Sequence, residues 1–180
     1  MKATAFVVGS EDGSGATLRQ LARQIGFRAV YPFRSVVDAE RQCIATPLIY
    51  FMFSAADGMD SARVVAAQIR GSGQDIRYAP MIYFAEMPSV ETIRTCVEIG
   101  FDDVIALPVP LSRVEARLDR QVKCPLVYYE TATYFGPDRY RFRDGVGHPD
   151  RGRGGAHRRY EIVRTTSGVN VRDDDVQIMV

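Results

Sequence analysis

Residues 48–60 read LIYFMFSAADGMD, and this stretch decides the fold. It begins with an uninterrupted apolar run, Leu48–Phe53, which is typical of a β-strand buried on both faces. Gly58 marks a turn, and Asp60 is a suitable cap for a helix that continues to Arg70. The stretch therefore predicts a strand, a turn and a helix, the unit from which parallel α/β sheets are built.

The same alternation occurs five times before residue 124. The expected strands are rich in Val, Ile, Phe and Tyr and are Ala3–Val8, Arg28–Tyr31, Leu48–Phe53, Met81–Ala85 and Val104–Leu107. The expected helices have apolar residues with helical period and are Ala16–Ile25, Ser35–Ile44, Asp60–Arg70, Ser89–Ile99 and Leu111–Val122. Such an order predicts a flavodoxin-like (βα)5 α/β fold, a doubly wound parallel sheet with helices on both faces.

The helix expected over 89–99 has clear end signals and a regular apolar face. Ser89 is a suitable N-cap and Gly100 a suitable stop. Val90, Ile93 and Val97 recur with helical spacing, so we expect them to face the core.

Composition describes an ordinary globular chain. Its 180 residues are 46% hydrophobic and 25% charged, and the net charge of +1 gives no overall bias toward nucleic acid or anionic membranes. Three cysteines without metal-ligand spacing predict reduced, mostly buried thiols. The sequence has no apolar run near the roughly 18 residues of a spanning helix, and MKATAFVVGS is too short for a signal peptide. We therefore expect a cytoplasmic protein with no membrane association.

Four short motifs keep the spacing of a known family. They are Gly58–Met59–Asp60 after the third strand, Pro80–Met81–Ile82 at the start of the fourth, EIGFDD over 98–103 at the end of the fourth helix, and Pro108 after the fifth strand. On these motifs, residues 3–123 resemble the receiver domain of bacterial two-component response regulators, of the chemotaxis-receiver type. The resemblance implies a (βα)5 fold and a role in signal transduction and phosphorelay.

The resemblance also implies a reactive centre whose groups this chain lacks. In receivers, two acids hold magnesium, an aspartate accepts a phosphoryl group, and a hydroxyl and a lysine contact the phosphoryl oxygens. The corresponding positions here, taken in that order, are Gly9 and Ser10, Phe53, Ala85 and Leu107. Magnesium prefers carboxylate oxygens, the acceptor must be a carboxylate, and the developing charge needs a cation. We therefore expect a degenerate pocket plugged by the Phe53 ring, with no metal, no cofactor and no enzymatic activity.

The switch of receivers couples that hydroxyl to an aromatic residue on the fifth strand. Ala85 and Val104 occupy these two positions, so we expect the switch to be lost and the outer face to keep one state. Asp102 and Asp103 are expected to end a helix and start a strand. An alternative, residual metal binding, would use acids on loops at the same edge, which are Glu11, Asp12, Asp57 and Glu86. For Asp57 we favour a solvated acid in a turn.

Gly9, Gly13 and Gly15 allow a different hypothesis. Their GxxxGxG spacing, between a strand and a helix, fits the dinucleotide-binding loop of short-chain dehydrogenases. No acid follows the second strand for a ribose hydroxyl, and no Tyr-xxx-Lys pair exists among the two lysines. We therefore favour a glycine turn.

A compositional change at Pro125 predicts a domain boundary, with a receiver-like domain over 1–124 and an Arg/Tyr-rich extension over 125–180. Residues 134–141 read YFGPDRYR, which is similar to the GPDR-type tail that follows the receiver fold in some bacterial regulators. Within it, Gly136–Pro137–Asp138 predicts a turn. On a strand beyond this turn, arginines and rings would alternate as Arg139, Tyr140, Arg141, Phe142 and Arg143.

That stripe has two interpretations. Tyr140 could pack onto the domain or a second subunit while the arginines stay in water. Alternatively, Arg139, Arg141 and Arg143 could clamp a phosphate of a nucleotide, a cyclic dinucleotide or a nucleic acid. Residues 139–164 hold eight arginines against three acids, which makes a modest basic patch.

The end of the chain predicts a glycine-rich linker around 145–157 and then a hairpin. Tyr160–Thr165 and Val169–Arg172 would be its strands, Asp173–Asp175 an acidic turn, and Val176–Val180 a further short strand or a disordered end. These strands are too few to fold alone, so we expect them to dock on the first domain or to exchange with a second copy as an arm.

Two functions follow from the sequence. The first is a phosphorylation-independent pseudo-receiver that acts as a protein-binding adaptor and is not an enzyme. Its expected partner is a histidine kinase, a regulator or a motility component, and its expected assembly is a homodimer. The second is an effector that binds a nucleotide messenger or nucleic acid through its arginine-rich tail.

Overall fold

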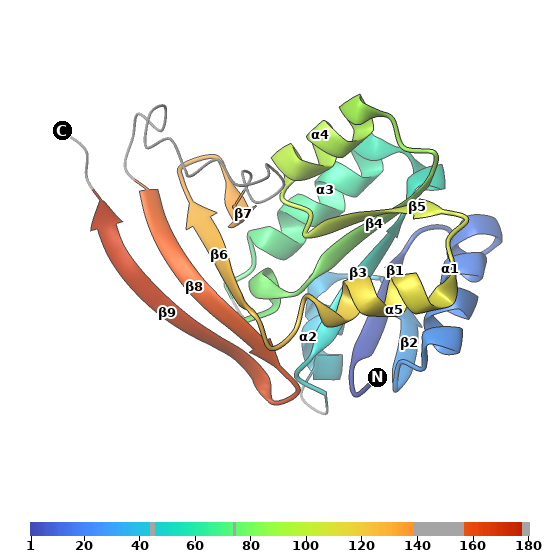
Figure 1. Cartoon of the computed structure of the whole chain (residues 1–180), viewed down its shortest axis with the longest axis horizontal. Coiled ribbons are helices and arrows are strands. Elements are labelled where there is room, and N and C mark those ends of the chain that lie inside the picture. Colours follow the sequence, from blue (N-terminus) through green and yellow to red (C-terminus); the bar gives the residue numbers. More distant parts are fainter. Residues whose placement is uncertain (44–45, 74, 139–156, 178–180) are drawn as a thin grey trace.

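The computed structural model describes residues 1–43, 46–73, 75–138 and 157–177 and contains two sheets (Figure 1). The first sheet is parallel, with strand order β2-β1-β3-β4-β5. Its strands are β1 (Thr4–Val8), β2 (Ala29–Pro32), β3 (Ile49–Ser54), β4 (Met81–Glu86) and β5 (Asp103–Leu107). The predicted flavodoxin-like α/β fold is thus confirmed, and each strand lies within one residue of its predicted bounds.

Five α-helices connect and cover these strands. They are α1 (Gly13–Ile25), α2 (Val36–Cys43), α3 (Met59–Arg70), α4 (Val90–Ile99) and α5 (Leu111–Asp119). Two short 3-10 helices, η1 (Ala55–Asp57) and η2 (Asp75–Tyr78), precede α3 and β4. The predicted ends of α4 are confirmed, because Ser89 Oγ accepts a hydrogen bond from Thr92 N and Gly100 adopts a left-handed φ of 100°.

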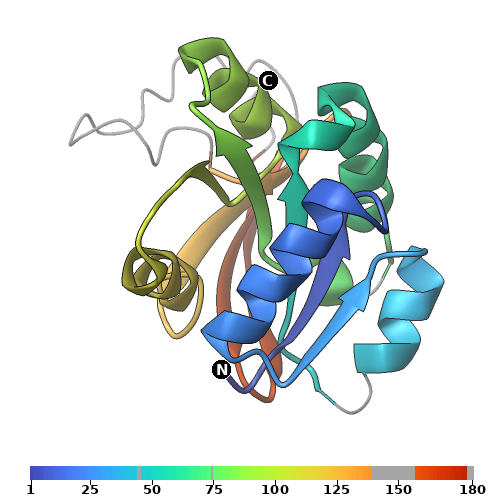
Figure 2. The same ribbon diagram turned by 90° about the vertical axis from the view of Figure 1, so that its right-hand side faces the viewer.

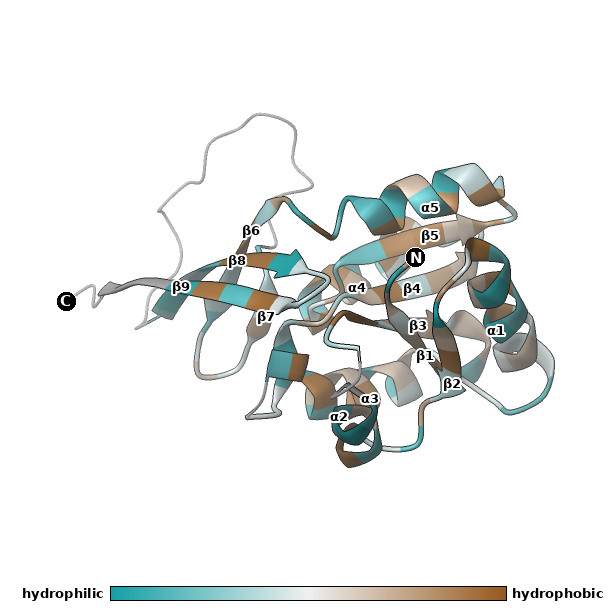
Figure 3. Cartoon of the chain, turned by 90° about the horizontal axis from the view of Figure 1, so that it is seen from below, coloured by the Kyte–Doolittle hydropathy of each residue, from teal (hydrophilic) through white to brown (hydrophobic). Residues whose placement is uncertain are grey.

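Each face of the first sheet has its own apolar core. Leu18, Ala22 and Ile25 of α1 and Val114 and Leu118 of α5 pack on one face. The opposite face packs against buried residues of α2, α3 and α4, which are Ala39, Ala62, Ala66, Ile69 and Cys96. Figures 2 and 3 show the apolar strands enclosed between these helix layers. The central strands β1, β3 and β4 are mostly apolar because helices cover both faces of the sheet there.

The second sheet is antiparallel and has the order β7-β6-β8-β9. Its strands are β6 (Pro125–Glu130), β7 (Phe135–Pro137), β8 (His157–Thr165) and β9 (Gly168–Gln177). The predicted hairpin is confirmed, since β8 and β9 pair from Thr165 and Gly168 outward. The sequence did not indicate β6, which pairs along its whole length with β8.

Two predicted turns in this region are wrong. Gly136 and Pro137 lie in β7, where they pair with Tyr129 and Tyr128. The acids 173–175 lie inside β9, and the pairing of β9 with β8 shifts register between Asp174 and Val176. A β-bulge therefore replaces the expected turn. Residues 145–156 of the predicted linker and residues 178–180 lie outside the described part, and His157 already belongs to β8.

The second sheet packs on the first half of its own chain through an aromatic cluster. This cluster contains Tyr78 from η2 and four residues of the second sheet, Tyr128, Phe135, Tyr160 and Ile162. Along β8, buried residues alternate with partly exposed ones, so that one face of the strand meets the first sheet. A close contact also joins α4 to β7, because a Cβ on Gly136 would lie 3.0 Å from Gly100 Cα.

Candidate functional site

A small cavity of about 290 Å³ opens at the carboxyl ends of β1 and β3 and the start of α3. Gly9, Ser10 and Phe53, three of the five predicted pocket residues, line it together with Ser54 and Asp57. The structure thus brings these three together at the edge where the carboxyl ends of parallel strands meet, the usual place for a site in such sheets.

The other two predicted residues lie away from this cavity. Ala85 is 5% exposed and belongs to the core under α3 and α4. Leu107 is partly buried and packs on the opposite face, in the core under α1 and α5. The two side chains are therefore on different faces of the sheet.

The Phe53 side chain is both a wall of the cavity and a core residue. It is fully buried, and its ring meets Phe101 edge-on at a centroid distance of 4.8 Å. Phe101 in turn contacts Tyr83 at 5.3 Å. A carboxylate at this position would be surrounded by aromatic carbon, where an ion is strongly destabilised unless paired.

Asp57 ties the two loops at the mouth of the cavity together. Its Oδ1 atom accepts a hydrogen bond of 3.1 Å from Ser10 N, and a Cβ on Gly9 would lie 3.0 Å from its Oδ2. The side chain is exposed, as predicted, but it bonds to the β1–α1 loop instead of being only solvated. The acid therefore serves as an internal partner for the backbone of this loop.

The glycines of this loop have packing roles. A Cβ on Gly15 would lie 1.9 Å from Ser10 O, and Gly13 has a positive φ of 58°. Only glycine fits the first position, and the second favours it. This explains two of the three glycines in the GxxxGxG spacing without a dinucleotide.

Comparison with solved structures relates this geometry to known proteins. A structure described as that of a response regulator from Chloroflexus aurantiacus J-10-fl matches with a TM-score of 0.50 and 15% identity, over 66% of this chain and 95% of that chain. A structure described as that of a pilus assembly protein (cpaE) from Burkholderia thailandensis E264 matches with a TM-score of 0.50 and 16% identity, over 67% and 98%. The first sheet and its helices have the receiver fold. No protein-family model matches the chain, and a search of the curated proteins finds no match.

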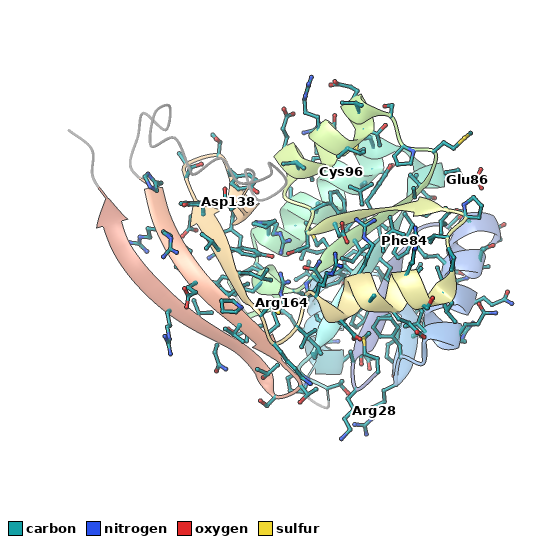
Figure 4. The ribbon with its side chains drawn as sticks, viewed as in Figure 1. Arg28, Phe84, Glu86, Cys96, Asp138 and Arg164 are labelled. Atoms are coloured by element: carbon teal, nitrogen blue, oxygen red, sulfur yellow. The ribbon has the colours of Figure 1, made fainter. Side chains whose placement is uncertain are left out.

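The acids of the alternative metal site lie at the edge of the first sheet where its strands have their carboxyl ends. Glu11, Asp12 and Glu86 are exposed, and Figure 4 shows Glu86 at the outer end of β4. Among the described residues, no group of three or more His, Cys, Asp or Glu side chains is placed to hold a metal ion. In the same described part, no helix combines the length and the apolar character that a membrane crossing requires.

The two residues predicted to occupy the switch positions, Ala85 and Val104, are both apolar and lie in one core. Ala85 on β4 pairs with Ala106 on β5, and Val104 packs partly buried against the same core as Ala85. Neither side chain can form the hydrogen bond or the large ring rotation that a receiver switch uses.

Asp102 has a structural role that the sequence did not predict. It is fully buried, and its Oδ2 accepts from Arg70 Nη2 at 2.7 Å and from Met81 N at 2.9 Å. Its Oδ1 accepts from Arg164 Nη2 at 2.8 Å and from the Tyr128 hydroxyl at 2.6 Å. Asp102 therefore joins the receiver fold to the second sheet, a role that its position in the EIGFDD motif did not indicate.

We call Asp102, Arg70, Arg164 and Tyr128 the buried ionic cluster. Arg164 points from β8 toward the first sheet (Figure 4), is fully buried, and also donates to Tyr78 O at 2.6 Å and to Gln121. Arg70 also donates to Gly100 O and Ala79 O. Burial, opposed by the two arginines, raises the pKa of the Tyr128 hydroxyl above its ordinary value, so it stays a donor at all physiological pH values.

α4 exposes apolar residues that the sequence analysis placed in the core. Val90 is 75% exposed and Ile93 41%, while Val97 is partly buried and Cys96 fully buried. Met87, in the loop before α4, is 89% exposed with a φ of 43°. The prediction for Val90 and Ile93 is wrong because the core under α4 is completed by Cys96 and Phe101.

The structure also shows the environment of two of the cysteines. Of the cysteines, Cys96 is buried, and burial raises its thiol pKa to about 12, whereas Cys124 is exposed. The candidate anion-binding residues Arg139, Tyr140, Arg141 and Arg143 lie outside the described residues. The last described residue before them is Asp138, whose N donates to Val127 O.

Proposed function

We propose that this protein is a phosphorylation-independent pseudo-receiver of two-component-type signal transduction that acts as a protein-binding adaptor. The observation that carries the proposal is the buried Phe53 ring at the acceptor position, packed on Phe101. Phosphotransfer needs a carboxylate nucleophile there, and an aromatic ring offers none.

The surroundings of Phe53 support the same conclusion. Gly9 and Ser10 provide no carboxylate for magnesium, and Leu107 provides no cation. Asp57, the acid that lines the cavity, bonds to Ser10 N. With alanine and valine at the switch positions, no group could transmit an event in the cavity to the outer face.

A surface for a partner supports the adaptor role. Met87 in the loop before α4 and Val90 and Ile93 in the first turn of α4 are exposed apolar residues, three positions apart in the sequence. Exposed apolar side chains that gather in one region of the surface are typical of protein interaction sites. The partner we propose is a signalling protein, such as a histidine kinase, a regulator or a motility component, and we propose a homodimeric cytoplasmic protein without catalytic activity.

Phosphorylation chemistry tests the first half of this proposal. The purified protein is incubated with magnesium and acetyl phosphate, or with magnesium and beryllofluoride, beside a receiver that has the complete acidic site. We expect no adduct by mass spectrometry and no shift in amide spectra, whereas the control receiver responds. A hydroxylamine-sensitive adduct on any carboxylate near the cavity would contradict the proposal.

Variants of the exposed surface test the adaptor role. A triple variant, Met87→Ser, Val90→Ser and Ile93→Ser, should lose at least tenfold in affinity for a histidine kinase or regulator that the native protein captures. The control is Val37→Ser, which changes a valine that is 56% exposed on α2. Equal losses in both variants would contradict the assignment of this surface.

A second candidate function rests on the basic composition of residues 139–164, which hold eight arginines and three acids. Arg164 is buried in the ionic cluster, so seven of these arginines remain for a ligand. In this function the protein binds a nucleotide messenger or nucleic acid through Arg139, Arg141 and Arg143, with Tyr140 stacking on a base. Titration with cyclic di-GMP and with a short RNA, repeated after the three arginines are changed to alanine, tests it. Salt-sensitive binding that the variant loses would support this function over the adaptor.

A further inference from the structure

A second cleft lies at the other end of α3 from the degenerate pocket. It has a volume of about 530 Å³ and lies between the C-terminal ends of α3 and α4 and the loop that joins β6 to β7. Its lining includes Arg63, Arg70, Ser72 and Arg77, with Tyr134 and Phe135 as an aromatic wall. We call it the hairpin cleft.

Two residues that line the hairpin cleft each hold one buried side-chain atom that has no hydrogen-bond partner in the described part of the chain. These atoms are Arg77 Nε and Ser72 Oγ. The Arg77 guanidinium lies 3.6 Å over the centre of the Phe135 ring, and its Nη2 donates to Glu130 Oε1 at 2.6 Å. This contact holds the guanidinium in place and leaves its Nε–H unused. A buried donor without a partner costs free energy, so it indicates a missing acceptor.

The charges below the hairpin cleft favour an anion as that acceptor. Arg70 lies in the lining and shares Asp102 with Arg164, so two buried guanidinium groups face one carboxylate. Arg63 adds an exposed guanidinium to the lining, and it has no ion pair with a described residue. A positive excess in a partly enclosed site attracts anions more strongly than one in open water.

Two glutamates also line the hairpin cleft and oppose an anion. Glu130 already accepts from Arg77 and from the Tyr160 hydroxyl, and these bonds lower its pKa although burial raises it. Its charge is therefore largely neutralised within the protein. Glu98 has an interaction of its own as well, so neither glutamate stands as an isolated negative charge.

We propose that the hairpin cleft binds an oxyanion, the phosphate or carboxylate group of a small molecule. The Arg77 and Ser72 side chains, whose Nε and Oγ atoms are closed to solvent in this structure, turn toward the cleft and donate to the anion. Arg63 supplies charge at the mouth, and Tyr134 borders the organic part of the ligand. Arginine is well suited to this role because its N–H groups match the geometry of phosphate and carboxylate. The volume lies in the usual range of small-molecule sites. The site uses none of the residues that line the cavity beside Phe53, and none of Met87, Val90 and Ile93. Its test is therefore independent of the proposed function.

Calorimetric titration and amide spectra of the full chain test the proposal. The probes are sodium phosphate, AMP and sodium acetate, each at constant ionic strength. We expect saturable binding of at least one probe, with amide shifts at Ser72 and Arg77. Phosphate and AMP binding without acetate binding identifies a phosphate site, and the reverse identifies a carboxylate site.

Two variants and two controls make the test decisive. Ser72→Ala and Arg77→Lys each remove one proposed donor and should weaken binding about tenfold, the usual effect of losing a hydrogen bond to a charged group. Ser72→Ala leaves the aromatic cluster untouched, so it remains informative if Arg77→Lys fails to fold. Arg94→Gln, which removes an exposed arginine of α4, should bind like the native protein, and so should a variant with alanine at 139, 141 and 143. Absence of saturable binding, or equal affinity in Ser72→Ala and native protein, would overturn the proposal and would mean that water satisfies both atoms.

Discussion

The cavity beside Phe53 and the buried ionic cluster differ in their chemistry. The cavity is lined by Gly9, Ser10 and the fully buried Phe53 ring, with Asp57 as an acid in its lining. In the ionic cluster, Asp102 and Arg164 are both fully buried, and the carboxylate accepts four hydrogen bonds. Charged groups in the ionic cluster are buried and paired with one another, and Asp102 attaches the second sheet to the first through Arg164 and Tyr128.

The largest expected effect concerns the ionic cluster. Asp102→Ala leaves Arg70 and Arg164 buried without a counter-ion, so the free energy of unfolding should fall by about 3–5 kcal/mol. Urea denaturation followed by circular dichroism measures this change. Glu91→Ala is the matched control, since it removes the carboxylate from an exposed arginine pair on α4 and should cost less than about 1 kcal/mol. Similar losses in the two variants would show that the buried ionic cluster contributes no more stability than an exposed ion pair.

A second effect concerns the contact between the two parts of the chain. In Gly136→Ala, the new methyl group would lie 2.8 Å from the Tyr134 hydroxyl oxygen and 3.0 Å from Gly100 Cα. Relieving this overlap requires β7 to move from the end of α4, and we expect a loss of about 1–3 kcal/mol. Gly73→Ala is the control, because a Cβ there meets no atom within 4 Å. If thermal denaturation gives the same midpoint for both variants, the contact at Gly100 is not tight.

The sequence predicted the first sheet well because its signals are local. Apolar runs such as Leu48–Phe53 and caps such as Ser89 and Gly100 depend only on neighbouring residues. It failed for Asp102 because the partners Arg70 and Arg164 are 32 and 62 residues away. An acid that meets its partners only through tertiary folding has no periodic signature, and a fully buried arginine is rare enough that Arg164 was read as part of a basic patch.

The lack of a local sequence signal for tertiary contacts also explains the wrong predictions in the second sheet and in α4. The pairing of β6 with β8 joins residues on opposite sides of the undescribed segment 139–156, so no hairpin signal precedes it. Gly136–Pro137 resembles a turn in isolation, yet β7 is an edge strand, where proline is tolerated. Val90 and Ile93 have the period of a buried face, but period alone cannot say which face meets a core.

A smaller effect is expected at the degenerate pocket. Asp57→Ala removes the acceptor of Ser10 N, and because this bond is exposed we expect a loss of about 0.5–1.5 kcal/mol. Hydrogen exchange at the Ser10 amide should become faster in the variant. Asp12→Ala is the control, since the Asp12 side chain makes no capping bond at α1 and its loss should change stability by less than about 0.5 kcal/mol. Unchanged exchange at Ser10 would show that Asp57 does not hold the two loops together.

The smallest effect is the pH dependence contributed by Glu130. Burial alone would raise its pKa, but hydrogen bonds from Tyr160 and Arg77 outweigh this and lower the pKa below the ordinary value of 4.5. A carboxyl group with a lowered pKa in the folded state stabilises the protein above its unfolded pKa, and this stabilisation is lost as the pH falls through the folded value. Because the side chain is partly exposed, solvent screening limits the effect to less than about 1 kcal/mol. We therefore expect the difference in unfolding free energy between native protein and Glu130→Gln to be constant from pH 7 to pH 5 and to shrink below about pH 4.5. A difference that grows in acid would mean that Glu130 is protonated more readily in the folded protein, and that its bonds to Arg77 and Tyr160 are not formed in solution.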